Sequence, residues 1–253
     1  MHQEGTRPLV SIVVPVLQDT PELEGLLDAL HVDRLDARVE VIVVNGNAAD
    51  RSLEPLRERL TTVRWIDSEP GRGRQMNAGA AASSGVWLLF LHADARLGDA
   101  WLPALADADD RPDVVGGAFR LALASRHWAA RVIERGVAIR TLWLRLPYGD
   151  QAIFVRRERY DALGGFRPSG LMEDVDFVGR LRRQGRLWFP PVSVRVSARR
   201  WERDGWLRRT VLNLALLGLY AAGVSPDRLA RWYYGPCPDT PPRRASSVGV
   251  SER

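Results

Sequence analysis

Nearly continuous runs of apolar residues, separated by helical stretches, constrain the fold of this chain more than any other feature. They occupy residues 9–16 (LVSIVVPV), 39–44 (VEVIVV) and 86–92 (VWLLFLH). Strands that are apolar on both faces are typical of a parallel sheet with helices packed on both sides. With 253 residues, the chain can bury the core of one large domain. The sequence therefore predicts an α/β fold with a mostly parallel central sheet flanked by helices.

The ends of these strands are where we expect a site, because ligands of parallel sheets bind beyond the carboxyl ends of the strands. Four segments meet this condition, at residues 15–19, 45–50, 67–74 and 92–94. The strand at 39–44 is followed by Asn45, Gly46 and Asn47, which are short residues suited to a turn. We expect a ligand contact at this turn.

The second half of the chain has a less regular pattern. It predicts a strand at 113–123, a helix at 127–146, a strand at 151–160 that runs into a helix, and a helix at the acidic cluster 172–176. The segment 180–209 carries ten arginines against Glu202 and Asp204, so we expect a helical, arginine-rich C-terminal part. Residues 1–7 are predicted to be flexible. Residues 235–253, rich in Pro, Ser and Arg, are predicted to be disordered.

Charge and cysteine content narrow the partners and the compartment. The net charge is +5 and all 36 basic residues are arginines, which bind phosphates in a bidentate manner. Nucleic acid, an anionic membrane surface or a phosphorylated small molecule would each suit this charge. The one cysteine, Cys237, excludes an internal disulfide and is compatible with a reducing cytosol. The apolar N-terminal run is shorter than a signal peptide requires.

An apolar stretch at residues 211–224 has two interpretations. It is too short to span a bilayer, which takes about 20 residues. We favour a helix packed on the sheet or on a second copy of the chain. The alternative is a helix that lies in a membrane interface together with the arginine-rich segment.

Two motifs in the first half could carry chemistry. His92 and Asp94 alternate at a strand end and could hold a divalent cation or a ribose, although Asp94 could instead cap a turn. Arg72 and Arg74 stand beside a helix N-terminus, where a diphosphate can bind. The same loop resembles a dinucleotide fingerprint with Asp94 as its ribose acid, but Met76 stands where the third glycine should be.

The acidic cluster in the second half is a third candidate. Glu173 and Asp174 begin a helix, and neighbouring helical residues point about 100° apart, so one of them can face a ligand. A carboxylate there could serve as a general base. The alternative is an acidic first turn that pairs with Arg180 or Arg182.

Several of these segments, taken in order, resemble the family 2 glycosyltransferases of GT-A (Rossmann-like) fold. They are SIVVPVLQDTPELEGLL, VEVIVVNG, GRGRQMNAGA, LLFLHADARL, YGDQAIFVRR, ALGGF, LMEDVDF and RRWERDGWLRRTVLN. The sequence is similar to the small subgroup named for arsenosugar biosynthesis. The resemblance implies one GT-A domain over residues 8–234, with a nucleotide-sugar-binding half at 8–97 and an acceptor-binding half at 98–234.

The resemblance also implies roles for individual residues. Asp174 would be the general base, with Glu173 beside it. Asp94, the last acid of a D-x-D motif that here reads His92, Ala93, Asp94, would hold the metal. Asn45 stands where relatives carry an acid that contacts the base of the donor. Residues implied to bind the donor are Pro15, Val16, Asn45, Gly46, Arg72, Arg74, Asn77, His92, Ala93, Asp94 and, from a degenerate Q-x-x-R-W motif, Arg200 and Trp201.

The expected function is therefore metal-dependent, inverting transfer of a sugar from a nucleoside diphosphate to an acceptor, with Mn²⁺ or Mg²⁺. The acceptor would be a small molecule or a lipid-linked one, not a nucleic acid. Two alternatives stay open, a catalytically silent nucleotide- or phosphate-binding protein and a membrane-surface transferase acting on a polyprenyl phosphate. We expect a cytoplasmic protein, with contact to the inner face of the membrane and a homodimer both left open.

Overall fold

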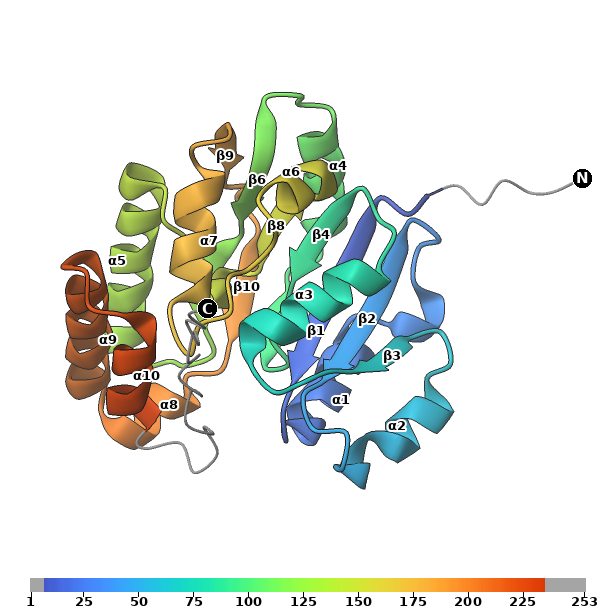
Figure 1. Ribbon diagram of the computed structural model, residues 1–253, viewed down its shortest axis with the longest axis horizontal. Helices are drawn as coiled ribbons and strands as arrows, with labels where there is room; N and C mark the ends of the chain where they lie inside the picture. Colours follow the sequence, from blue (N-terminus) through green and yellow to red (C-terminus); the bar gives the residue numbers. More distant parts are fainter. Residues whose placement is uncertain (1–6, 235–253) are drawn as a thin grey trace, which may run out of the picture.

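A computed structural model describes residues 7–234 of the chain (Figure 1). The tail predicted to be disordered, 235–253, and its Cys237 lie outside the described residues, as do residues 1–6 of the segment predicted to be flexible. Arg7 is described, and its Nε donates to the carbonyl of Ser84 at 2.6 Å.

The centre of the fold is a seven-stranded sheet in the order β3-β2-β1-β4-β8-β6-β9. Only β8 is antiparallel to its neighbours, β4 and β6, and the other pairs are parallel. A second sheet has the order β5-β10-β7. The strands are β1 (Val10–Val16), β2 (Val39–Asn45), β3 (Arg64–Asp67), β4 (Trp87–Phe90), β5 (Ala95–Leu97), β6 (Val114–Ala118), β7 (Arg120–Leu123), β8 (Ile153–Arg156), β9 (Arg186–Trp188) and β10 (Ser193–Val196).

Helices cover both faces of the central sheet, as the apolar strands predict (Figure 1). Alternate residues of β1 enter two separate cores: Ile12 and Val14 face α1 and α4, whereas Val13 faces α3. The α-helices are α1 (Thr20–Ala29), α2 (Glu54–Arg59), α3 (Arg72–Ala82), α4 (Trp101–Asp109), α5 (Trp128–Leu144), α6 (Arg157–Ala162), α7 (Glu173–Leu181), α8 (Arg199–Asp204), α9 (Trp206–Ala221) and α10 (Pro226–Tyr234). Short 3-10 turns are η1 (Val32–Arg34), η2 (Arg51–Leu53) and η3 (Gly149–Gln151).

The predicted strand at 113–123 is in fact two strands in different sheets. The chain leaves the central sheet after β6 and enters the second sheet as β7, and Phe119 at the corner is buried. The backbone of β9 approaches so closely that a Cβ at Gly117 would lie 1.8 Å from the carbonyl oxygen of Trp188. An uninterrupted apolar run cannot reveal such a corner, because both strands are buried.

The C-terminal part is helical and rich in arginine, as predicted, but the favoured packing of 211–224 on the sheet is wrong. Leu216 is the only buried residue of α9, while Val211 and Leu214 are 55% and 61% exposed. Among the described helices, none is both long and apolar enough to cross a membrane.

Candidate functional site

An open cleft of about 570 Å³ lies beyond the ends of the first three strands of the sheet. Gly46, Asn47 and Ala48 after β2 form one wall, and Asp67 at the end of β3 forms another. Its lining residues are Leu17, Gly46, Asn47, Ala48, Asp67, Ser68, Glu69 and Pro70. The volume falls within the range of small-molecule sites, about 300–1,000 Å³.

Asn45 lies beneath this cleft and is not among the residues that line it, and its predicted contact with a ligand stays a prediction. Its side chain is buried, and Nδ2 donates to the carbonyl of Asn47 (2.8 Å) and to Oδ1 of Asp67 (3.0 Å). Its Oδ1 accepts the Asn47 N–H at 3.0 Å. The amide is thus used to fold the turn and to hold Asp67. Hydrogen bonds from Arg57, and also from Asn45, keep the pKa of Asp67 below its usual value.

Gln75 of α3 lies beneath Gly46. Its Nε2 donates to the carbonyl oxygens of Val16 (2.8 Å) and Val44 (2.9 Å), and the N–H of Gly46 also donates to Val16. A Cβ at Gly46 would lie 2.9 Å from the Gln75 side chain, so a larger residue at position 46 would require Gln75 to shift. The carbonyl of Val16 accepts two hydrogen bonds and its side chain is buried, and its predicted contact with the donor stays a prediction.

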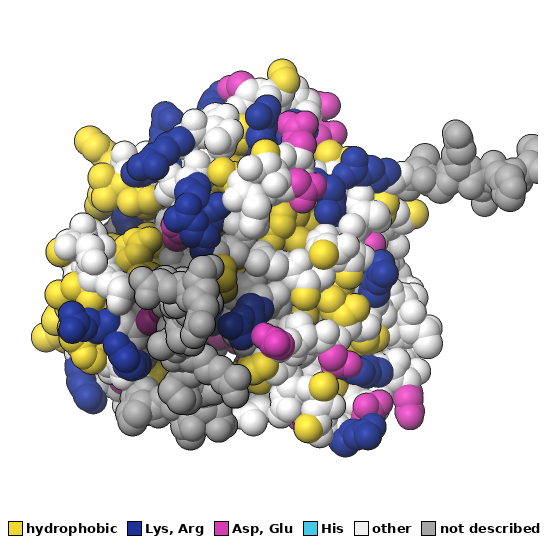
Figure 2. Space-filling model, in the orientation of Figure 1, with side chains coloured by type: hydrophobic (Ala, Val, Ile, Leu, Met, Phe, Trp, Pro, Cys, Tyr) yellow, Lys and Arg dark blue, Asp and Glu magenta, His cyan; other side chains and the backbone are white. Residues whose placement is uncertain are grey.

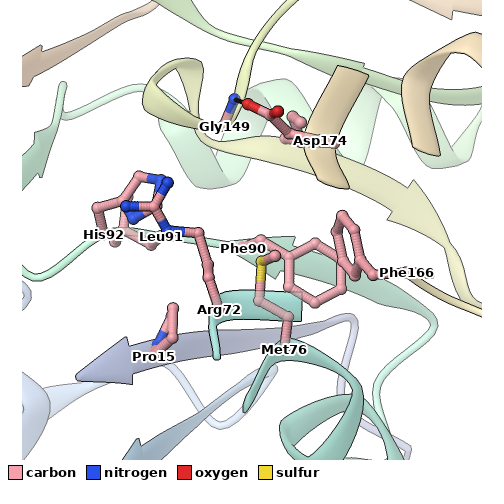
Figure 3. A pocket seen from close by; sticks show the side chains of 10 residues that line it. Pro15, Arg72, Met76, Phe90, Leu91, His92, Gly149, Phe166 and Asp174 are labelled. Carbon is pink, nitrogen blue, oxygen red and sulfur yellow. Dashed lines mark hydrogen bonds between the residues drawn. The ribbon is translucent and has the colours of Figure 1, made fainter. Parts of the chain in front are cut away.

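A narrower pocket lies between the ends of β1 and β4 and the start of α7 (Figure 3). Arg72 extends from α3 toward His92, and Asp174 lies across the pocket from Pro15 (Figure 3). Its walls combine apolar side chains with a few polar groups, and its volume of about 10 Å³ leaves room for about one water molecule. The lining residues are Pro15, Arg72, Met76, Phe90, Leu91, His92, Gly149, Ile153, Phe166 and Asp174.

Asp174 is held in place by backbone groups. The N–H of Gly149 donates to its Oδ2 at 2.6 Å (Figure 3), and the N–H of Val175 donates to its Oδ1 at 2.8 Å. A Cβ at Gly149 would lie 3.2 Å from both Asp174 Oδ2 and His92 Nε2. Glycine therefore allows this loop to fit tightly between the two side chains.

Arg72 and Arg74 point in different directions, because positions two apart on a helix point about 200° apart. Arg72 enters the pocket, where its Nη1 lies 3.8 Å from Oε1 of Glu173. Arg74 is not among the residues that line this pocket, and it pairs at 3.1 Å with Glu69, which lines the open cleft. That both arginines contact a diphosphate stays a prediction.

Glu173 is the buried partner in this pair, with only 5% of its surface exposed. Burial, and then the neighbouring charge of Asp174, raise the pKa of Glu173, and Arg72 opposes them. Glu173 is not among the residues that line the pocket, so Asp174 is the acid of the predicted pair that faces a ligand.

His92 and Asp94 both follow β4. Burial, together with the charges of Arg72 and Arg200, holds the pKa of His92 well below its usual value, so the imidazole is neutral at pH 7. Ala93 between them is buried and its carbonyl accepts a hydrogen bond from Arg96, so a predicted ligand contact of Ala93 is not supported.

The Asp94 carboxylate fits a divalent cation by its chemistry. Within residues 7–234, no group is hydrogen-bonded to it. Asp94 adds to the causes, led by burial, that raise the pKa of both Asp19 and Asp150, so a cation here would relieve repulsion among carboxylates. No three His, Cys, Asp or Glu side chains in the described part gather as a metal-ligand cluster. Mg²⁺ sites of this kind commonly complete their coordination with water and phosphate oxygens.

Three further predicted residues have mainly supporting positions. Asn77 holds the loop before α7, because its Oδ1 accepts from Tyr160 (2.5 Å) and from the Phe166 N–H (2.9 Å). Its Nδ2 donates to the Phe166 carbonyl at 2.8 Å, and its predicted contact with the donor stays a prediction. Arg200 is exposed at the start of α8, and its charge acts on His92 and Asp19. Trp201 packs against the core, and its buried Nε1 has no partner among the described residues.

The turn η3 contributes residues to which the sequence assigns no role. Burial raises the pKa of Asp150 to about 6, and the charges of Asp174 and Asp94 add to this against those of Arg140 and Arg72. Gln151 fixes the turn, because its Oε1 accepts from Arg140, Thr141 and the Tyr148 N–H, and its Nε2 donates to the Phe119 carbonyl. Only the motif YGDQ, at residues 148–151, marks this turn in the sequence.

Comparison with known proteins gives a consistent family. The sequence profile of the family described as Glycosyl transferase family 2 matches residues 11–169. The chain is 30% identical over 210 residues to an O-antigen biosynthesis protein of Myxococcus xanthus, covering 70% of this chain and 16% of that protein. It is 28% identical over 171 residues to a PGL/p-HBAD biosynthesis glycosyltransferase of Mycobacterium bovis, covering 63% of each. The chain thus spans less than two thirds of either relative.

The fold also matches a solved structure. A mannosyltransferase from Pyrobaculum calidifontis, solved in complex with GDP-Man and Mn²⁺, superposes with a TM-score of 0.64 at 19% identity. The match covers 90% of this chain and 69% of that one. At this identity, the likeness shows that the two chains share a fold.

Proposed function

The chain belongs to glycosyl transferase family 2, and from this membership and the geometry of the site we propose that it transfers a sugar from a nucleoside diphosphate to an acceptor hydroxyl, with inversion. The observation that carries the proposal is the placement of Asp174. Its carboxylate is fixed by the Gly149 N–H and faces a pocket that also holds Arg72 and His92. A base, a cation and a neutral imidazole thus surround one small space.

The cleft and the pocket suit the two ends of a nucleotide sugar. The open cleft at Gly46–Asp67 would take the nucleoside, because it lies beyond β1, β2 and β3, where such ligands bind in parallel sheets. The diphosphate would then lie near Arg72, at the start of α3, where the guanidinium and the helix N-terminus both favour negative charge. The sugar would extend from there toward Asp174 and lie at the mouth of the pocket, whose volume of about 10 Å³ is too small to enclose it.

The proposed reaction is a single displacement. Asp174 takes the proton from the acceptor hydroxyl. The oxygen of that hydroxyl bonds to the anomeric carbon from the side opposite the leaving group. The bond from that carbon to the diphosphate oxygen breaks, and the nucleoside diphosphate leaves with the electron pair. Arg72 stabilises the charge that develops on this oxygen. Each oxygen of Asp174 accepts one backbone N–H and retains a lone pair for the proton.

Asp94 is the residue that would hold Mn²⁺ or Mg²⁺. Such an ion, when bound, supplies positive charge that offsets the charge of the diphosphate. The donor's nucleoside can be identified by thermal unfolding with UDP-, GDP- and dTDP-sugars in the presence of either ion, because a ligand that binds the folded state raises the midpoint. We expect the nucleotide sugars of one nucleoside to raise the unfolding midpoint more than those of the other two.

The variant Asp174→Asn tests the central role. We expect transfer to fall by about 10²–10⁴-fold, the usual contribution of a general base, with donor binding preserved. Transfer is measured by release of nucleoside diphosphate, and the anomeric configuration of the product by NMR. Asp94→Asn serves as the contrasting variant, because it should weaken donor binding in Mn²⁺. Full transfer by Asp174→Asn, or a product with retained configuration, would exclude the proposed mechanism. Donor binding without any transfer or hydrolysis would instead indicate a silent nucleotide-binding protein.

A further inference from the structure

Two helices on one edge of the molecule, α5 and α9, expose an unusual number of large apolar side chains. Trp143 is 83% exposed, Leu207 is 79% exposed and Trp128 is 72% exposed. The other exposed apolar residues of the two helices are Val132, Ile139, Leu142, Leu144, Val211, Leu212, Leu214 and Leu219. Figure 2 shows hydrophobic side chains gathered at the left edge of the view, where α5 and α9 lie in Figure 1. We call this surface the α5–α9 face.

The helical spacing shows that these side chains form stripes. On α5, Trp128, Val132, Ile139 and Trp143 fall on one side of the helix, at intervals of four and seven residues. On α9, Leu207, Val211 and Leu214 recur at intervals of four and three residues. The buried residues of α5 are Ala129, Ala130 and Thr141, and Leu216 is the buried residue of α9. The apolar stripes therefore point away from the protein core.

The two helices begin next to each other, so their stripes belong to one surface. The ring of His127, which precedes α5, stacks on the ring of Trp206, the first residue of α9, with 5.0 Å between centroids and 7° between planes. An apolar surface of this size is rare on a soluble monomer and marks a contact with a partner or a membrane.

Arginines outnumber acidic residues around the face. Arg131, Arg135, Arg145 and Arg208 are exposed on or beside the two helices. The only acidic residue of α5 is Glu134, which is already paired with Arg131 at 2.9 Å, and α9 has no acidic residue. Directly before α9, Glu202 is exposed, and Asp204 is paired with Arg203 and Arg209. The apolar stripes are thus bordered by an excess of positive charge.

We propose that the α5–α9 face docks on the surface of a lipid bilayer that contains anionic lipids. Tryptophan suits the boundary between headgroups and acyl chains, and arginines beside it attract anionic headgroups. A second copy of the chain fits this face poorly. A two-fold contact brings the same face of both copies together, so two surfaces bordered by an excess of arginines would meet.

The position of the face also suggests the class of acceptor, and this step rests on the proposed transfer. The chain leaves α5 at Leu144 and reaches, within five residues, Gly149, whose N–H holds Asp174. The Asp174 side of the pocket is therefore close along the chain to the docking face, which suits an acceptor carried by a lipid.

Sedimentation of the full chain with vesicles tests the docking. The vesicles contain either phosphatidylcholine alone or a mixture with phosphatidylglycerol, at low and at high salt. We expect binding to the anionic vesicles that weakens in salt. The double variant Trp143→Ser, Leu207→Ser should lose most of this binding. Arg135→Ser combined with Arg208→Ser should weaken it by about tenfold or more, given the usual effect of two cations near such a surface.

Arg51→Ser is the matched control. The Arg51 side chain is 84% exposed, but it lies on η2, in the half of the protein that contains the open cleft. It should bind vesicles like the unchanged chain. Circular dichroism and the unfolding midpoint verify that each variant is folded, and donor binding without vesicles reports on the proposed transfer site separately. Failure of donor binding would thus count against the proposed function and leave the docking result unaffected.

Three outcomes would overturn the proposal. The first is no binding of the full chain to anionic vesicles. The second is binding that persists in the Trp143→Ser, Leu207→Ser variant, which would assign docking to another surface. The third is a dimer in sedimentation velocity that the same variant dissociates, without vesicle binding, which would assign the face to a second copy of the chain.

Discussion

The two sides of the site are built in different ways. On the side of the open cleft, buried hydrogen bonds tie the strand ends together, and Gln75 links Val16 to Val44. On the side of Asp174, turns and surface helices form the wall. Non-glycine residues adopt positive φ angles on both sides: Gln18 (59°) follows Leu17 of the cleft, and Ala152 (49°) and Met172 (66°) lie on the Asp174 side. Met172 directly precedes the helix that carries Asp174.

This contrast teaches how the fold divides its tasks. The cleft is fixed by the same core that makes the sheet stable, so it can recognise a constant part of a ligand. The opposite wall depends on a few specific contacts, such as those of Gln151, and on backbone conformations with a local energetic cost. We expect changes on the first side to alter binding and stability, and changes on the second side to alter the reaction.

Separate substitution of Arg72 and Arg74, the two arginines of α3, should give the largest difference in activity. Arg72→Gln should lower kcat/KM by about 10²–10³-fold, because it removes a charge aimed at the leaving group. Arg74→Gln is the matched control, and it should stay within about twofold because its pair with Glu69 is exposed to water. Steady-state kinetics measure both. Equal losses in the two variants would show that both side chains reach the diphosphate.

Gly149→Ala tests the fit of the turn between His92 and Asp174. The added methyl group would lie 3.2 Å from an atom of each, so one of them must shift. Overpacking of this kind costs about 1–3 kcal/mol, and we expect kcat to fall by about tenfold or more. Donor affinity, measured by calorimetry, should change little. A variant with unchanged kcat would show that the position of Asp174 does not depend on this turn.

Asn45→Asp separates support of the cleft from direct contact with the ligand. The substitution replaces a donor to Asn47 and Asp67 by a carboxylate, so it places two negative charges together. We expect it to lower the free energy of unfolding by about 1–3 kcal/mol, as for other broken buried hydrogen bonds. Chemical denaturation measures this change. A variant that keeps full stability but prefers a different nucleoside would instead support direct contact between residue 45 and the ligand.

Asp150→Asn should have the smallest effect, and its sign depends on pH. The pKa of Asp150 is about 6 in the folded protein and 3.8 in a model peptide, so the charged form is disfavoured by folding. The unchanged protein therefore loses stability as pH rises from about 4 through about 6. The variant avoids this loss and should be more stable at pH 8 by about 1–2 kcal/mol, allowing for partial exposure to water.

Denaturation of both proteins at pH 4 and pH 8 checks this prediction, because the difference should nearly vanish at pH 4. An Asp150→Asn variant that is less stable at pH 8 would show that the attraction between Asp150 and the charges of Arg140 and Arg72 outweighs burial. Loss of transfer in a variant of higher stability would indicate that Asp150 is retained for function.

Much of the framework follows from the sequence, because local patterns encode it. Strands that are apolar on both faces predict β1, β2 and β4. The order of the motifs, through the resemblance to the family, predicts that Arg72, His92 and Asp174 share a site with Pro15. The same patterns cannot tell which of the two arginines of α3 enters the pocket, because both are the same residue type. Only the direction in which each leaves the helix places Arg72 in the pocket and Arg74 at the surface.

The sequence by itself therefore determined the sheet, the edge at which ligands bind and the residue types available there. The tertiary structure alone decided which of these residues are free. Asn45 donates a hydrogen bond to Asp67 and Asn77 donates one to Phe166, and both partners are distant in sequence. By contrast, Asp150 has a buried oxygen without a partner among the described residues, and the α5–α9 face has exposed apolar side chains. The physical reason is that periodicity reports the environment along one element, but satisfaction of a polar group depends on which other elements pack against it.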